Sequence, residues 1–194
     1  MRLSIANGIR TIFPVLERLT MRLLLMSLLL PLSLALAGCG LASFDIPITD
    51  TVTVEAGAPS DEQTLELPEK FKELRLNATK EFGDSGFGIK DVESVKLTRA
   101  RIKVLTPGAN LDFLTSARFF VQGPAGSGLE NKVEIGSVSN IAPGSTSVSL
   151  SVKNTNLKEY AMLDSMTISA EADRGELEEA VDLEVHAVFH VEVF

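Results

Sequence analysis

Few residues of this chain have the types and spacing that chemistry requires, and the two histidines are the first of them. His186 and His190 lie in an alternating stretch near the end of the sequence, with Glu184 and Glu192 on the same polar side. Histidine and glutamate are common metal ligands. Residues four apart on a strand are separated by about 13 Å, too far to share one ion, so a partner strand would have to supply the other ligands. We expect both histidines to face solvent among carboxylates.

The carboxylates form no complete calcium-binding or catalytic pattern. The glycine-rich acidic segment 81–91 contains Asp84 and Asp91, but it lacks the series of oxygen ligands and the closing glutamate of an EF-hand loop. Its glycine spacing matches no nucleotide-binding loop. We expect a flexible connection here, with a ligand held by the loop as the alternative.

Motifs of known hydrolase classes are missing from the sequence. It has neither a Gly-x-Ser-x-Gly elbow nor a His-Glu-x-x-His helix. Two carboxylates could still act as they do in glycosidases, but nothing singles out a pair. We expect no catalytic residue, no metal site and no cofactor.

The only cysteine, Cys39, follows an apolar run that begins after Arg22 and ends in small residues. This order of charged, apolar and small residues is typical of a secretory signal. The run from Leu23 to Ala37 is shorter than the roughly 20 residues of a spanning helix, and Pro31 interrupts it. A lone cysteine in an exported chain has no intramolecular disulfide partner, so either it has another use or it is incidental.

Leu36, Ala37, Gly38 and Cys39 together resemble the lipobox of bacterial lipoproteins. In that family a signal peptidase cuts before the cysteine, and lipid is attached to the sulfur and to the new amino terminus. The resemblance implies lipidation of Cys39 and a membrane anchor. In enteric members Asp after the cysteine favours the inner membrane, so Gly40 implies the outer membrane. The resemblance covers the export segment only, and the region after it resembles no named domain family.

The lipobox resemblance divides the chain into a signal peptide at 1–38, a short lipidated tether at 39–43 and one folded domain at 44–194. Because residues 1–20 make the charged region unusually long, we hypothesise that translation starts at Met21.

The composition after the signal narrows the choice of partners. Residues 1–38 contain four arginines and one glutamate, so the rest of the chain has a formal charge of −11, against −8 for the whole. Such a domain disfavours binding to nucleic acid and to bare anionic membranes. The chain has no tryptophan and one tyrosine, which lowers the expectation of a carbohydrate-binding face.

Alternating apolar and polar residues predict strands along most of the domain, with Gly- and Pro-containing turns between them. The expected strands are 44–48, 51–55, 72–79, 94–104, 117–122, 132–138, 146–153, 165–172 and 180–194. One short helix is expected at 157–163. This pattern predicts an all-β fold, a single antiparallel β-sandwich of jelly-roll or immunoglobulin-like topology with at most one short helix.

Two of these strands carry further predictions. In 94–104 the apolar residues change face near Thr98 and Arg99, which indicates a β-bulge or a crossing between sheets. The same strand has a dense row of cations, Lys96, Arg99, Arg101 and Lys103. We expect them to pair with carboxylates on neighbouring strands, with nucleic-acid binding as the alternative. The strand at 180–194 is long and regular, so it belongs near the middle of a sheet with one wet face.

We therefore expect a lipid-anchored cell-envelope protein, held in the outer membrane, whose sandwich binds or scaffolds without catalysis. Its expected partners are the membrane, through the lipid, and an envelope protein or glycan. An envelope hydrolase that acts through carboxylates and a Ca²⁺-dependent adhesin are the alternatives.

Overall fold

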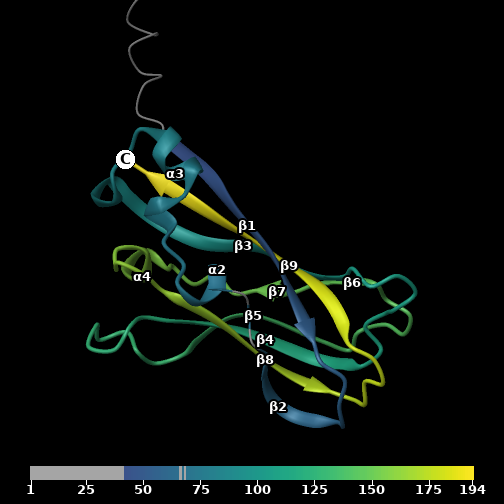
Figure 1. Ribbon diagram of the computed structural model, residues 1–194. Helices are drawn as coiled ribbons and strands as arrows, with labels where there is room; N and C mark the ends of the chain where they lie inside the picture. The colour runs from purple at the N-terminus through teal and green to yellow at the C-terminus, as the bar shows by residue number, and fades with distance from the viewer. Residues whose placement is uncertain (1–41, 66, 68) are drawn as a thin grey trace, which may run out of the picture. The chain divides into compact units, whose positions relative to one another are not determined.

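In the computed structural model of the protein, the described residues are 42–65, 67 and 69–194. The lipobox residues and the Met21 start lie outside them. The chain divides into two units, Met1–Gly40 and Leu41–Phe194, and the second is built on two antiparallel sheets (Figure 1). Within the described part of the chain, no helix is both long enough and apolar enough to cross a bilayer.

The first sheet has four strands in the order β1-β9-β3-β6, and the second has five in the order β2-β8-β4-β5-β7. The strands of the first sheet are β1 (Ala42–Val54), β9 (Val181–Val193), β3 (Val92–Val104) and β6 (Ser147–Ser149). Those of the second are β2 (Ser60–Leu65), β8 (Thr167–Arg174), β4 (Leu114–Gln122), β5 (Val133–Ser139) and β7 (Ser151–Val152).

The pairing of the strands distinguishes a jelly roll from an immunoglobulin-like topology, the two arrangements that the sequence left open. Only Leu150 lies between β6 and β7, so one extended segment leaves the first sheet and enters the second. Counted as one strand, it makes eight strands that pair from the ends inward: β1 with β9, β2 with β8, β3 with β6 and β4 with β5. A long antiparallel hairpin rolled into two sheets is a jelly roll. The predicted β-sandwich is confirmed.

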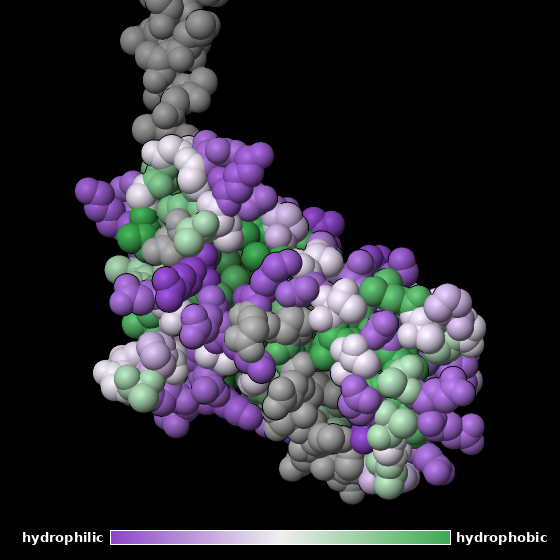
Figure 2. All heavy atoms as spheres, in the orientation of Figure 1, coloured by the Kyte–Doolittle hydropathy of each residue, from purple (hydrophilic) through white to green (hydrophobic). Residues whose placement is uncertain are grey.

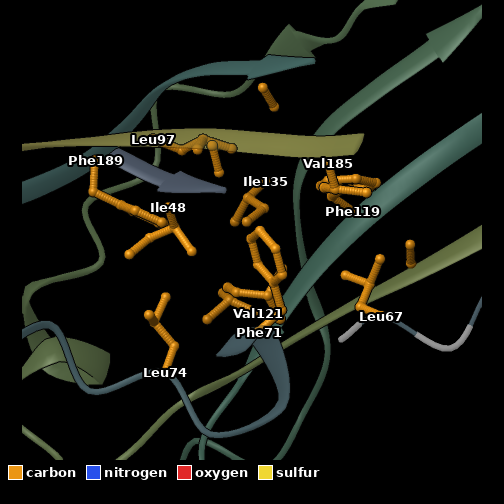
Figure 3. Packing of buried hydrophobic residues seen from close by; sticks show 14 of the residues in the cluster. Ile48, Leu67, Phe71, Leu74, Leu97, Phe119, Val121, Ile135, Val185 and Phe189 are labelled. Atoms are coloured by element: carbon orange, nitrogen blue, oxygen red, sulfur yellow. The ribbon is translucent and has the colours of Figure 1, made fainter. Parts of the chain in front are cut away.

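The core lies between the sheets and is built from the inward-facing residues of both. Figure 3 shows Leu97, Val185 and Phe189 of the first sheet, together with Phe119 and Ile135 of the second. Phe119 and Phe189 are at most 1% exposed, and aromatic side chains of this size contribute strongly to hydrophobic stabilisation. Figure 2 shows hydrophilic side chains over much of the visible surface, with patches of apolar side chains between them.

The predicted bulge in β3 is present. The pairing of β3 with β9 shifts between Leu97 and Arg99. Because of this shift, apolar residues of opposite sequence parity all reach the core: Val95, Leu97, Ala100, Ile102 and Val104. The central position predicted for the last strand is also confirmed, since β9 lies between β1 and β3.

The described residues contain three short α-helices, where the sequence predicted at most one. α4 (Lys158–Ala161) forms at the expected place. The segment expected as a strand at 72–79 instead contains the end of α2 (Glu69–Lys72), a single bridge at Leu74 and the 3₁₀ turn η1 (Leu76–Ala78). The segment expected as a flexible loop at 81–91 holds most of α3 (Lys80–Ser85) and the 3₁₀ turn η2 (Ile89–Asp91).

Burial and capping stabilise these two helical segments. Leu67, Phe71 and Leu74 are spaced four and three residues apart, as on one face of a helix, and all three are buried. In α3 the Thr79 hydroxyl accepts a hydrogen bond from the Phe82 amide, and Gly86 ends the helix with φ +76°. The strand prediction failed because Leu74 and Leu76 also fit an alternating pattern.

Candidate binding surfaces

The two histidines lie on the outer face of the four-stranded sheet and make separate contacts with β1. The Nδ1 atom of His190 is 2.8 Å from Asp45 Oδ1, and that of His186 is 2.7 Å from Thr49 Oγ1. Both side chains are half-buried, where the sequence predicted that they face solvent among carboxylates; His190 contacts a carboxylate and His186 a hydroxyl. Among the described residues no group of three or more His, Cys, Asp or Glu side chains is arranged to hold a metal ion.

In the acidic segment 81–91, where a bound calcium ion was the alternative, one of the two aspartates stabilises the local fold. Asp91 Oδ2 accepts a hydrogen bond from the Gly88 amide at 2.7 Å, which caps η2. Asp84 is exposed in α3. The structure therefore does not bring these two aspartates into a shared site with a third acidic group.

Two of the four cations on β3 contact carboxylates of the same sheet, and one of the two, Arg101, does so on an adjacent strand, as predicted. Arg99 Nη2 is 3.5 Å from Asp45 Oδ2 on β1, and Arg101 Nη2 is 3.5 Å from Glu184 Oε1 on β9. Both contacts are long, and the arginine side chains are 71% and 47% exposed. Exposed pairs of this kind contribute little to stability.

A hollow of about 340 Å³ lies beside these arginines on the outer face of the four-stranded sheet. It is found where β3 bulges and where β6 ends. Its lining is Thr98, Arg99, Ala100, Arg101, Ser149, Leu150 and His186. None of these lining residues is acidic.

A second hollow, of about 520 Å³, lies on the outer face of the five-stranded sheet and has a mixed lining. The lining is Ser116, Arg118, Glu134, Ser137, Val138, Ser139, Ser151 and Asp173. Its carboxylates already have partners: Glu134 is 3.1 Å from Lys153 Nζ, and Asp173 accepts a hydrogen bond from Ser116 at 2.7 Å. The sequence did not point to this hollow, because its residues come from four strands whose order it does not reveal.

Cations also cover an aromatic ring beside this second hollow. Arg118 Cζ and Lys132 Nζ lie 5.8 Å and 5.7 Å from the centre of the Phe120 ring, and both side chains pair with Glu171. A cation at this distance from a ring is attracted by its π electrons. The charged groups of Arg118 and Lys132 therefore already have partners within the protein, namely the Phe120 ring and the Glu171 carboxylate.

Glu192, near the end of β9, has a lowered pKa. Ser94, which is buried, donates a hydrogen bond to Glu192, and this bond is the main cause that lowers the pKa of Glu192. Desolvation opposes the lowering, and the charges of Lys96 and His190 add to it. Glu192 is therefore held in its ionised form in the folded protein.

Comparison with known proteins provides no family for this chain. No protein-family model matches it, and no curated protein sequence matches it. The surfaces are therefore interpreted from their own chemistry.

Proposed function

We propose that this chain is a lipid-anchored protein of the cell envelope whose jelly-roll domain binds an envelope component without catalysing a reaction. The observation that carries the proposal is the position of Ala42, where β1 begins three residues after Cys39. Three extended residues span at most about 11 Å. A lipid on Cys39 would therefore hold this end of the four-stranded sheet close to a membrane.

Exposed apolar side chains at the same end support this orientation. Ala42 pairs with Val193, and Phe194, the next residue, is 70% exposed. Met162, which is 54% exposed, follows α4, whose Lys158 lies 5.9 Å from the Phe194 ring. Apolar side chains held next to a bilayer can enter its interfacial region.

The second candidate is an envelope hydrolase, which one observation favours. Glu134 and Asp173 line the same hollow on the five-stranded sheet, as a pair of catalytic carboxylates would. Each is already engaged by a neighbouring side chain, Lys153 or Ser116, so binding remains the better-supported function.

The intact mass of the membrane-extracted protein tests the anchor. We expect wild type to begin at Cys39 with acyl chains attached, and Cys39→Ser to keep the size of the precursor. Ser43→Ala, which changes a residue outside the lipobox, should be processed as wild type. A wild-type protein that is unmodified and found in the soluble fraction would overturn the proposal. The same spectra test the Met21 start, because the precursor would carry or lack residues 1–20.

Outer-membrane sorting is tested by separating the two membranes of a Gram-negative expression host on a density gradient. Wild type is expected with the outer membrane, and Gly40→Asp with the inner membrane. Gly40→Ser is the control that should leave the distribution unchanged. Wild type in the inner membrane would contradict the outer-membrane part of the proposal and leave the anchor intact.

A further inference from the structure

The hollow on the four-stranded sheet is cationic in a domain that is strongly acidic. Arg99 and Arg101 line it together with His186, and no carboxylate does. The hollow on the opposite sheet differs in this respect, because Glu134 and Asp173 stand beside Arg118 there. The lining therefore offers an anion two guanidinium groups and no carboxylate, in a domain with a formal charge of −11; Asp45 and Glu184, which contact these arginines, do not line the hollow.

Both arginines keep most of their hydrogen-bonding capacity for a ligand. A guanidinium group has five N–H donors. Arg99 and Arg101 each reach a carboxylate through one nitrogen, at 3.5 Å, instead of the two parallel bonds of a bidentate pair. Their exposed guanidinium groups can therefore turn to an anion in the hollow at little cost.

The sheet places these donors in a defined arrangement across three strands. After the bulge, Arg99 and Arg101 are two residues apart on one face, which corresponds to about 7 Å. Arg101 pairs with Ser149 of β6 on one side and with His186 of β9 on the other. The three side chains thus form a row across the strands. β6 ends immediately after Ser149, because the chain moves to the other sheet, and this leaves the sheet open beside Arg99.

We propose that this hollow binds the phosphate group of an envelope component. Two guanidinium forks match the oxygen atoms of a phosphate, and a tetrahedral phosphate can meet donors from several directions. The Ser149 hydroxyl is a third donor. When His186 Nδ1 accepts the hydrogen bond of Thr49, its Nε2 carries a proton and becomes a fourth. This inference deepens the proposed binding function by naming its ligand class, and it does not depend on the lipid.

Equilibrium dialysis of the full-length protein in a neutral detergent against labelled pyrophosphate tests the site. We expect saturable binding by wild type and a loss of about tenfold or more in affinity for Arg101→Gln, since hydrogen bonds to charged groups contribute that much. Arg101→Lys keeps the charge but not the fork and should fall between the two. Arg99→Gln should weaken binding in the same direction as Arg101→Gln.

Arg118→Gln is the matched control, because it removes an arginine from the other hollow. It should bind pyrophosphate as wild type does, and thermal unfolding would show that all variants are folded. Absence of saturable binding by wild type, or equal weakening by Arg118→Gln and Arg101→Gln, would overturn the site. The anchor is measured separately by mass, so either proposal can fail while the other stands.

The phosphate could belong to a lipid headgroup or to a soluble phosphorylated sugar, and competition distinguishes the two. Dihexanoyl phosphatidic acid and glucose 1-phosphate are each added against labelled pyrophosphate. Stronger displacement by the lipid supports a headgroup ligand, and stronger displacement by the sugar supports a phosphorylated glycan. Displacement by neither, at concentrations where unlabelled pyrophosphate competes fully, would contradict a phosphate site for larger ligands.

Discussion

Phe44 of β1 and Phe82 of α3 meet edge to face, with ring centroids 5.7 Å apart and planes inclined by 78°. This geometry is favoured by the quadrupoles of the two rings. α3 has only six residues, too few to be stable alone, so it depends on this contact and on its Thr79 cap. The pair fixes a helical segment against the first residues of β1, the part that is nearest to Cys39 in the sequence.

Phe82→Ala is expected to destabilise the domain by about 3 kcal/mol, because it removes a buried aromatic side chain and leaves a cavity. Urea unfolding gives this difference directly. Lys80→Ala, an exposed change in the same helix, should stay within about 0.5 kcal/mol of wild type. If both variants unfolded at the wild-type midpoint, the Phe44–Phe82 contact would have no part in stability.

Stability should depend on pH through Ser94 and Glu192. The pKa of Glu192 is lowered in the folded protein, so its ionised form stabilises the fold above the ordinary glutamate pKa. This contribution is lost as the pH falls through the lowered value. Ser94→Ala should therefore reduce the urea midpoint at pH 7, and its difference from wild type should shrink at pH 3. Ser147→Ala, on the exposed strand β6, is the control without pH dependence. An equal difference between Ser94→Ala and wild type at both pH values would contradict this account.

The open edge of β1 is protected against pairing with another chain. Lys70 Nζ donates to the Thr49 carbonyl at 3.3 Å, so this carbonyl points to the open edge. Pro47, two residues away, has its missing N–H on the same edge. Pro47→Val restores a donor there and is expected to increase self-association, measured by chemical cross-linking in detergent. Pro143→Val, in an exposed turn, should cross-link as wild type; the same yield from Pro47→Val would count against edge protection.

The proposed orientation at a membrane can be tested with a single fluorophore, because the chain has no tryptophan. In the lipidated protein on vesicles with brominated lipids, Phe194→Trp should be quenched. Leu105→Trp should not, since Leu105 follows the opposite end of β3, about 40 Å of strand away. Equal quenching of the two variants would mean that the domain has no fixed face toward the bilayer.

Most strands could be predicted because their signals are local. A half-buried strand alternates whatever it pairs with, so β9, β4 and β8 follow from their own residues. The bulge in β3 was predicted for the same reason, since the change of face between Leu97 and Ala100 is visible within one segment. The helix α4 was found at its expected place.

Only the tertiary structure decided the helices at Phe71 and Phe82, the jelly-roll pairing and the site. Helices of four and six residues are held by burial of one aromatic side chain, and burial depends on residues far away in the chain. The pairing of Ala42 with Val193 joins opposite ends of the domain, and no local pattern encodes it. The cations of β3 were evident from the sequence, but their hollow requires Ser149 and His186 on either side of Arg101. The alternation of apolar and polar residues predicts which side of a strand is buried. Which residues of other strands lie next to it depends on long-range packing, which the sequence alone does not show.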